Sequence, residues 1–98
     1  MAKTIKLLNA LPRTKAIKLH GSVFQQRGSP DIFGVNFSHP FVVEMKTELG
    51  KLSDIQKKRL AEWYEAGVRC IVSTEPIEVL RLVASPYGNW APRDLLTP

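Results

Sequence analysis

The 98-residue sequence has little cysteine and no long apolar run. Its one cysteine, Cys70, excludes an internal disulfide, and a single thiol in an apolar stretch is typical of a small buried residue in a protein of the reducing cytosol. No stretch of apolar residues approaches the roughly 20 that are needed to cross a membrane. We therefore expect a cytoplasmic globular domain and no membrane partner.

Acidic residues are missing from the first third of the chain. Residues 1–30 hold six basic residues and no Asp or Glu, which gives a charge of +6. Residues 31–98 hold eight basic and nine acidic residues, a charge of −1, so the whole chain carries +5. The six basic residues are Lys3, Lys6, Arg13, Lys15, Lys18 and Arg27. This one-sided distribution favours a polyanionic partner, most simply nucleic acid, over a surface that is merely solvated.

Hydrophobic periodicity and turn residues predict one α/β domain over residues 1–98. The expected elements are a helix over 3–11, strands over 15–26, 31–37 and 41–46, a helix over 54–66, a strand over 68–73, a helix over 76–83 and an irregular tail over 85–98. We expect the first strand to bend or bulge at Gly21. Ser53 is the expected N-cap of the helix over 54–66, and Gly67 its C′ residue. From the last helix, the residues expected to face the core are Ile77, Leu80 and either Val83 or Ala84.

The stretch GSPDIFGVNFSHPFVVEMK, residues 28–46, places charges on a hairpin that is otherwise apolar. A two-residue turn at 38–39 would pair Asp31 with Lys46 and Phe33 with Glu44. Because strand side chains alternate with a period of two, Asp31, Glu44 and Lys46 then share one face of the sheet.

Two carboxylates beside one ammonium group allow two explanations. A hard divalent cation needs such carboxylates, and an adjacent lysine can position water or stabilise developing negative charge, which together would permit attack of water on a phosphodiester. Alternatively, Asp31 and Lys46 form an ordinary cross-strand ion pair at the sheet edge, which is worth little.

The order Pro30-Asp31 followed by Glu44-x-Lys46 resembles the PD-(D/E)xK nuclease core. More narrowly, residues 23–80 resemble the VRR-Nuc (virus-type replication-repair nuclease) domain, which reads Gly-x-Pro-Asp, Glu-x-Lys, a short GKLS loop, a Gln on the next helix, then Gly and a buried strand. The matching residues are Gly28, Pro30, Asp31, Glu44, Lys46, Gly50, Lys51, Leu52, Ser53, Gln56 and Gly67. The resemblance implies a small mixed-sheet, restriction-endonuclease-like core of α-β-β-β-α-β order, with a C-terminal helix and an irregular tail.

The resemblance also implies a site. Asp31 and Glu44 would bind Mg²⁺ or Mn²⁺ with the Met45 carbonyl as a further ligand, Lys46 would activate or position the attacking water, and Gln56 would support the site from the helix. Stand-alone members, found mainly in phages and bacteria, resemble homodimeric endonucleases that cut branched DNA such as four-way junctions. The expected DNA contacts are the six basic residues of the first third together with Lys51.

One position departs from the family pattern, because members usually carry a Glu on an N-terminal helix and no acidic residue precedes Asp31 here. Water, Gln25 or Gln26 could take its place, or the site could have fewer ligands. The chain could also be a DNA-binding module that has lost catalysis. A third possibility is a protein-interaction domain whose basic segment is incidental.

Two further expectations concern Gln56 and assembly. SDIQ is a capping box in which Gln56 reaches back to the Ser53 backbone, so capping explains Gln56 as well as catalysis does. A homodimer would bury more apolar surface than a domain this small can bury alone. The expected interface draws on the N-terminal segment 5–11 and on Tyr87, Trp90, Leu95 and Leu96.

Overall fold

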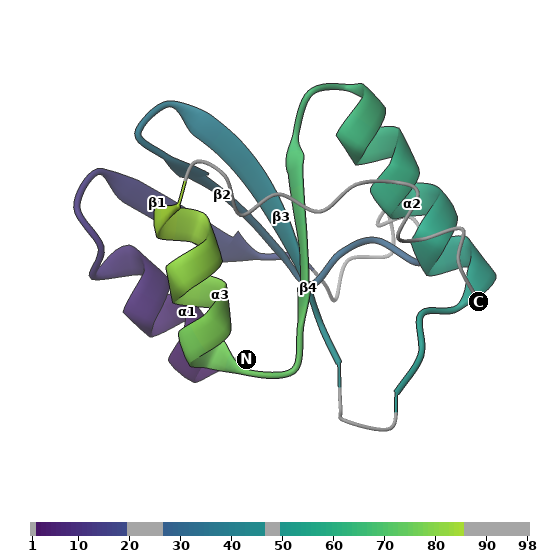
Figure 1. Cartoon of the computed structure of the whole chain (residues 1–98), viewed down its shortest axis with the longest axis horizontal. Coiled ribbons are helices and arrows are strands. Elements are labelled where there is room, and N and C mark those ends of the chain that lie inside the picture. The colour runs from purple at the N-terminus through teal and green to yellow at the C-terminus, as the bar shows by residue number, and fades with distance from the viewer. Residues whose placement is uncertain (1, 20–26, 47–49, 86–98) are drawn as a thin grey trace.

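The computed structural model describes residues 2–19, 27–46 and 50–85 (Figure 1). Its elements are α1 (Ala2–Asn9), β1 (Thr14–Lys18), β2 (Ile32–Asn36), β3 (His39–Met45), α2 (Asp54–Glu65), β4 (Arg69–Ser73) and α3 (Pro76–Ala84). The strands form one sheet in the order β1-β2-β3-β4, antiparallel except for the parallel pair β3–β4. The predicted mixed α/β class is therefore confirmed. The expected bend at Gly21 and the tail from residue 86 onward lie outside the described residues.

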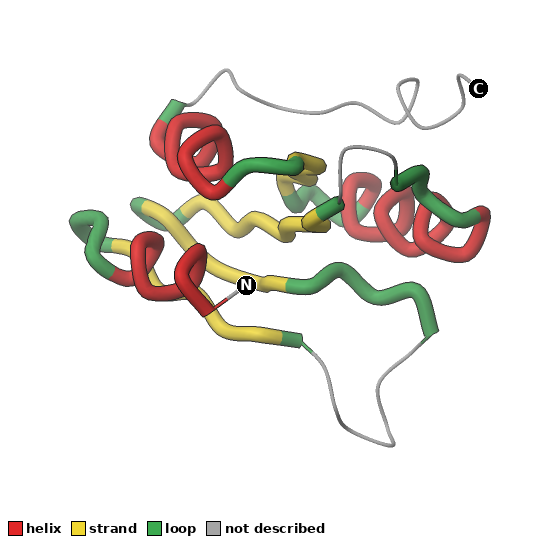
Figure 2. Tube along the Cα trace, turned by 90° about the horizontal axis from the view of Figure 1, so that it is seen from below, coloured by secondary structure: helices red, strands yellow, loops and turns green. Residues whose placement is uncertain are grey.

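Helices cover both faces of this sheet (Figure 2). α1 and α3 contact each other on one face, where the buried core consists of Leu8, Ala16, Ile32, Phe41, Val43, Ile71, Val79 and Val83. α2 covers the other face, where Val42, Leu60 and Cys70 are buried. β3 sends alternate side chains to the two cores because strand side chains alternate. None of the helices in the described ranges is long and apolar enough to span a membrane.

The β2–β3 hairpin turns one residue earlier than predicted. Phe37 and Ser38 form the turn with φ of 48° and 72°, and Asn36 pairs with His39. Positive φ at both central residues is what a tight type I′ hairpin turn requires. The predicted turn at 38–39 is therefore wrong, and so are the predicted pairings of Asp31 with Lys46 and of Phe33 with Glu44.

Proline explains the observed register. A two-residue turn is flanked by a hydrogen-bonded pair, in which both residues donate an N–H group. The predicted register would have put Pro40 in that pair, and proline has no N–H group to donate. In the structure Pro40 instead pairs with Val35, one pair further from the turn. This is a non-hydrogen-bonded pair, in which no N–H group is needed from Pro40. The correction shifts β3 by an even number of residues, so every side chain keeps its predicted face.

Both later helices follow from their sequences, with one error. Ser53 caps α2 in a full capping box, and Gly67 follows it with φ of 95°, as predicted. In α3, however, the buried residues are Val79 and Val83, whereas Ile77 is 66% exposed. Because α3 starts at Pro76, Ile77 lies in the first turn of the helix. Val79 and Val83, which are four residues apart, form the buried face instead.

The outer edge of β1 is closed by α1. The Ala16 N–H donates to Asn9 Oδ1 at 2.8 Å, and Asn9 Nδ2 donates to the Ala16 carbonyl at 3.0 Å. Leu8 of α1 is buried in the core, and Ile5 and Leu11 pack against the same core. The N-terminal half of the expected dimer interface is thus used within the chain. The other half, Tyr87, Trp90, Leu95 and Leu96, lies outside the described residues.

Candidate functional site

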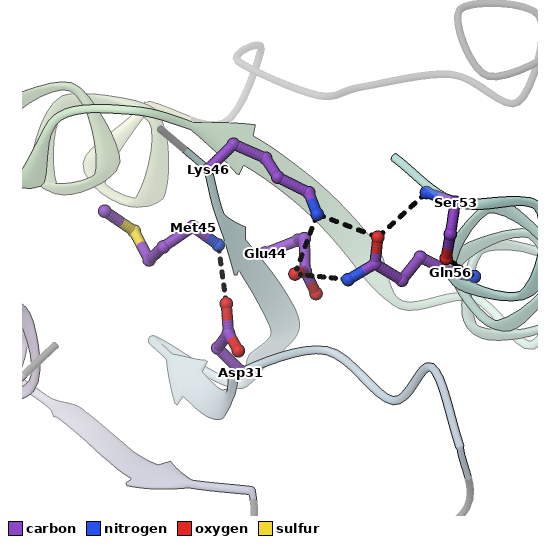
Figure 3. Close-up of polar contacts among 6 residues, drawn as sticks. All are labelled: Asp31, Glu44, Met45, Lys46, Ser53 and Gln56. Atoms are coloured by element: carbon purple, nitrogen blue, oxygen red, sulfur yellow. Dashed lines mark hydrogen bonds and ion pairs between the residues drawn. The ribbon is translucent and has the colours of Figure 1, made fainter. Parts of the chain in front are cut away.

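Four residues singled out in the sequence meet at the end of the hairpin that lies opposite its turn (Figure 3). Asp31 immediately precedes β2, Glu44 lies near the end of β3, Lys46 follows β3, and Gln56 lies in the first turn of α2. The N–H of Asp31 donates to the Val43 carbonyl at 2.9 Å, next to the last pair of the register, Ile32 with Val43. Asp31 is close enough to Glu44 for its charge to raise the pKa of that carboxyl group, and Glu44 contacts Gln56 of α2. The charged groups therefore gather on the side of the sheet that α2 covers.

Gln56 is the centre of a hydrogen-bond network that joins the helix to the charged pair. Its Oε1 accepts from Lys46 Nζ at 2.8 Å and from the Ser53 N–H at 2.9 Å. Its Nε2 donates to Glu44 Oε1 at 3.0 Å. The capping box is confirmed, and the same amide group also contacts Lys46 and Glu44, so capping does not exclude the predicted role in the site. The cap fixes the side-chain position from which Gln56 reaches the two charges.

Glu44 is a buried carboxyl group with an incomplete set of partners. Glu44 is 3% exposed, and its Oε2 atom has no hydrogen-bond partner. Burial, followed by the nearby Asp31 charge, raises the pKa of Glu44 to about 7, although Lys46 at 3.8 Å opposes this. A buried oxygen without a partner is costly. The arrangement is therefore one that a bound cation or a proton would stabilise.

Asp31 is held by the neighbouring strand. Its Oδ2 accepts from the Met45 N–H at 2.8 Å, which fixes the carboxylate beside the end of β3. The Met45 carbonyl, predicted as a metal ligand, belongs to the same stretch of backbone. Lys46 is anchored from the other side, since its N–H donates to the Ser73 carbonyl of β4 at 2.8 Å. Strands on both sides of β3 thus fix the positions of the charged residues.

The loop before Asp31 is pressed against α2 by contacts that the sequence did not indicate. Gly28 has φ of 78°, and a Cβ atom there would lie 2.9 Å from the backbone of Ile55. Arg59 holds the same loop, because its Nε donates to the Arg27 carbonyl at 3.1 Å. Glycine at position 28 therefore serves close approach and a left-handed backbone at once.

The predicted DNA contacts are all exposed but do not share a face. Lys3 and Lys6 lie on α1. Lys18 pairs with Ile32, which is buried in the core beneath α1 and α3, so Lys18 lies on that face of the sheet. Three others lie on the α2 side with the site: Lys15, which pairs with Val35; Arg27, whose carbonyl Arg59 binds; and Lys51, in the loop before α2. Arg13 lies beside the β2–β3 turn.

The described residues supply two acidic side chains to the site. No cluster of three or more His, Cys, Asp or Glu side chains occurs within the described ranges. Gln25 and Gln26, which could replace the expected third acid, lie outside those ranges. Comparison of the chain with protein-family models, with curated proteins and with solved structures gives no match. The family resemblance and the roles it implies therefore stay predictions.

Proposed function

We propose that the chain is a metal-dependent DNA endonuclease of the PD-(D/E)xK type, similar to VRR-Nuc domains. The observation that supports this most strongly is Glu44 Oε2, a buried carboxyl oxygen without a partner, on the same face as a second carboxylate and a lysine. An ordinary ion pair does not need such an arrangement. A fold gains nothing from burying a carboxyl oxygen that lacks a partner.

Asp31 and Glu44 suit Mg²⁺ or Mn²⁺, because both cations prefer oxygen ligands. Each carboxylate has one oxygen in a hydrogen bond, to Met45 N–H or to Gln56, which orients the other oxygen. The Met45 carbonyl is the proposed third protein ligand. Bound at these groups, the cation would supply Lewis acidity towards the phosphate and a lowered pKa for water.

Lys46 and Gln56 have separate proposed roles. Lys46 Nζ, 18% exposed at its side chain, would hold the attacking water or stabilise the negative charge that develops on the phosphate. Gln56 would position both Lys46 and Glu44 through its amide group. Neither residue needs to move far, since the capping box already fixes the start of α2.

The proposed substrate is branched DNA, such as a four-way junction, and the proposed assembly is a homodimer. Basic residues on the site face, Lys15, Arg27 and Lys51, would neutralise DNA phosphates.

A C2 dimer would supply the two active sites that a twofold-symmetric junction needs. Light scattering at micromolar concentration measures the assembly, and a monomer mass would leave an enzyme that cuts one strand at a time.

The direct test is incubation of the protein with a labelled four-way junction, a linear duplex and a single strand, each with Mg²⁺, with Mn²⁺ and with EDTA. We expect cutting of the junction only when a cation is present. Absence of cutting on all three DNAs with both cations would reject the endonuclease.

A second candidate, a DNA-binding module without catalysis, is favoured by the count of two acidic side chains among the described site residues. The same experiment separates the two functions. A binding module would retard the junction equally in EDTA and in Mg²⁺ and would leave both strands intact.

A further inference from the structure

The turn of the β2–β3 hairpin carries three of the backbone irregularities of the described chain. Every non-glycine residue with positive φ in the described ranges lies in this turn, as Phe37 and Ser38 do, or beside it, as Arg13 does. The Phe37 N–H donates to the Arg13 carbonyl at 3.0 Å. A left-handed conformation costs a residue with a side chain roughly 1–2 kcal/mol. Asn-Gly is the usual sequence for such a turn. The residues present are thus poorly suited to the backbone they adopt.

Phe37 does not repay this cost by packing. Its residue is 49% exposed, at the outermost point of the hairpin. The guanidinium of Arg13 lies over the ring, 5.5 Å from its centroid. Strained residues that persist without a folding benefit are typical of functional sites. An aromatic ring with a cation over it is also a common platform for stacking nucleic-acid bases.

A cavity of about 220 Å³ opens beside the ring, lined by Asn36, Phe37, His39, Arg69, Val83 and Ala84. It is smaller than the roughly 300–1,000 Å³ of pockets for drug-sized ligands, so a single flat ring fits it better than a large molecule. Its ionisable lining groups are His39 and Arg69, and none is acidic. Arg69 builds the wall, because its guanidinium donates to the Ser85 and Val83 carbonyls at 2.6 and 2.7 Å and so ties the end of α3 to β4.

We infer that this hairpin tip, defined as Arg13, Phe37, His39 and the adjoining cavity, binds an unpaired base of the DNA substrate by stacking it on Phe37. The inference rests on the proposed function for its choice of ligand. Charge supports that choice, since Arg13 lies over the ring and His39 lines the same cavity, and a cationic group suits the phosphates beside a base.

The length of β3 sets the distance between the tip and the catalytic site. From His39 to Glu44 the strand advances by roughly 17 Å, at about 3.3 Å per residue. DNA advances by about 3.4 Å per nucleotide. The stacked base would therefore lie at least about five nucleotides from the bond that is cut, because the cavity is lined from α3 whereas the catalytic residues face α2 on the other side of the sheet. The tip would select DNA that is unpaired beyond that distance, as it is beside a branch.

The test compares two labelled DNAs in EDTA, where no cutting occurs: a paired duplex, and the same duplex carrying an unpaired five-nucleotide extension. The variant F37N/S38G removes the ring while giving the turn its preferred sequence, so a loss of binding cannot come from unfolding. F37W keeps a stacking surface. I77A removes an exposed apolar side chain from α3 and serves as the control.

For F37N/S38G we expect affinity for the extended DNA to fall about 5- to 100-fold, the range for losing one base–aromatic stack, with unchanged affinity for the paired duplex. F37W and I77A should bind both DNAs as the wild type does. Unchanged affinity of F37N/S38G for the extended DNA, or an equal loss on both DNAs, would overturn the inference.

Cleavage in Mg²⁺ or Mn²⁺ separates this inference from the proposed function. If replacing Phe37 weakens binding of the extended DNA but the wild-type protein never cuts DNA, the nuclease is rejected and the base-binding tip is retained. A protein that cuts, and whose F37N/S38G variant binds and cuts as well as the wild type, would keep the nuclease and reject the tip.

Discussion

The two ends of the β2–β3 hairpin depart from ordinary folding preferences in opposite ways. At the open end, which lies opposite the turn, the carboxyl group of Glu44 is buried, and the residue is only 3% exposed. At the turn an aromatic side chain that the core would accommodate is left 49% exposed at Phe37. Each choice lowers the stability of the fold. The middle of the hairpin, by contrast, buries Ile32, Phe41 and Val43 as a stable sheet requires. The hairpin is therefore a rigid support that carries a destabilising group at each end.

The largest expected effect comes from the open end. Lys46→Ala should lower the cleavage rate about 100- to 1,000-fold, as loss of one charge-stabilising group does, because no other described cation contacts Glu44. Affinity for junction DNA in EDTA should stay near that of the wild type, since binding depends on the surface basic residues. Lys58→Ala, a charge removed from an exposed position of α2, is the control. Wild-type cleavage by the Lys46 variant would remove this residue from the mechanism.

Glu44→Gln should stabilise the protein in EDTA at pH 8. The pKa of Glu44 is raised from 4.5 to about 7 by burial, so the folded state holds its proton more tightly than the unfolded state. The stability from this group is therefore complete below pH 4.5 and is lost as the pH rises through 7. Above that pH the buried charge costs about 3 kcal/mol, which the neutral Gln avoids.

Urea unfolding from pH 4.5 to pH 8 measures this difference. The free energy of unfolding should fall with pH for the wild type relative to Glu44→Gln, and the two proteins should agree near pH 4.5. Glu62→Gln, at an exposed carboxylate paired with Arg59, is the matched control and should show no such window. If the free energies of unfolding of the wild type and of Glu44→Gln differ by a constant amount at every pH, burial of the ionised Glu44 does not destabilise the fold.

Gly28→Ala should destabilise the fold by about 1–3 kcal/mol, because a Cβ atom would meet the Ile55 backbone at 2.9 Å and the residue has φ of 78°. Since this loop leads directly to Asp31, cleavage should fall further than the folded fraction does. Gly67→Ala is the control: it has a similarly positive φ of 95° with no atom near the new Cβ. Thermal melting and the cleavage rate below the melting range give the two quantities. Equal effects of both substitutions on cleavage would show that the contact with α2 does not position the site.

The smallest effect extends the comparison to the two faces of the sheet. Replacing the site-face residues Lys15, Arg27 and Lys51 with Ala should reduce the slope of log affinity against log salt by about 0.9 per charge. Replacing Lys3, Lys6 and Lys18, which lie with the α1 face, removes the same charge and should leave the slope near its wild-type value. Anisotropy titrations at several salt concentrations measure both. An equal change for the two triple variants would mean that DNA contacts both faces.

The class of fold, the faces of the strands and the caps of α2 could all be predicted from the amino-acid sequence. These follow from local rules: strand side chains alternate, Ser53 and Gln56 form a capping box, and a glycine ends the helix. The alternation was enough to put Asp31 and Glu44 on one face even though the register was predicted two residues out. The correct register was also within reach, because Pro40 cannot donate the N–H group that the predicted pairing required.

The contacts that those residues make could not be predicted from the sequence, because they depend on how distant segments pack. Whether Gln56 contacts only the start of α2 or also Glu44 depends on how far α2 lies from β3, and at the observed separation it contacts both. The basic residues form one segment in sequence, yet α1 and β1 divide them between two faces. Phe37 is exposed because the turn formed around it. Such outcomes depend on packing between segments distant in the chain, and local sequence preferences carry no information about those distances.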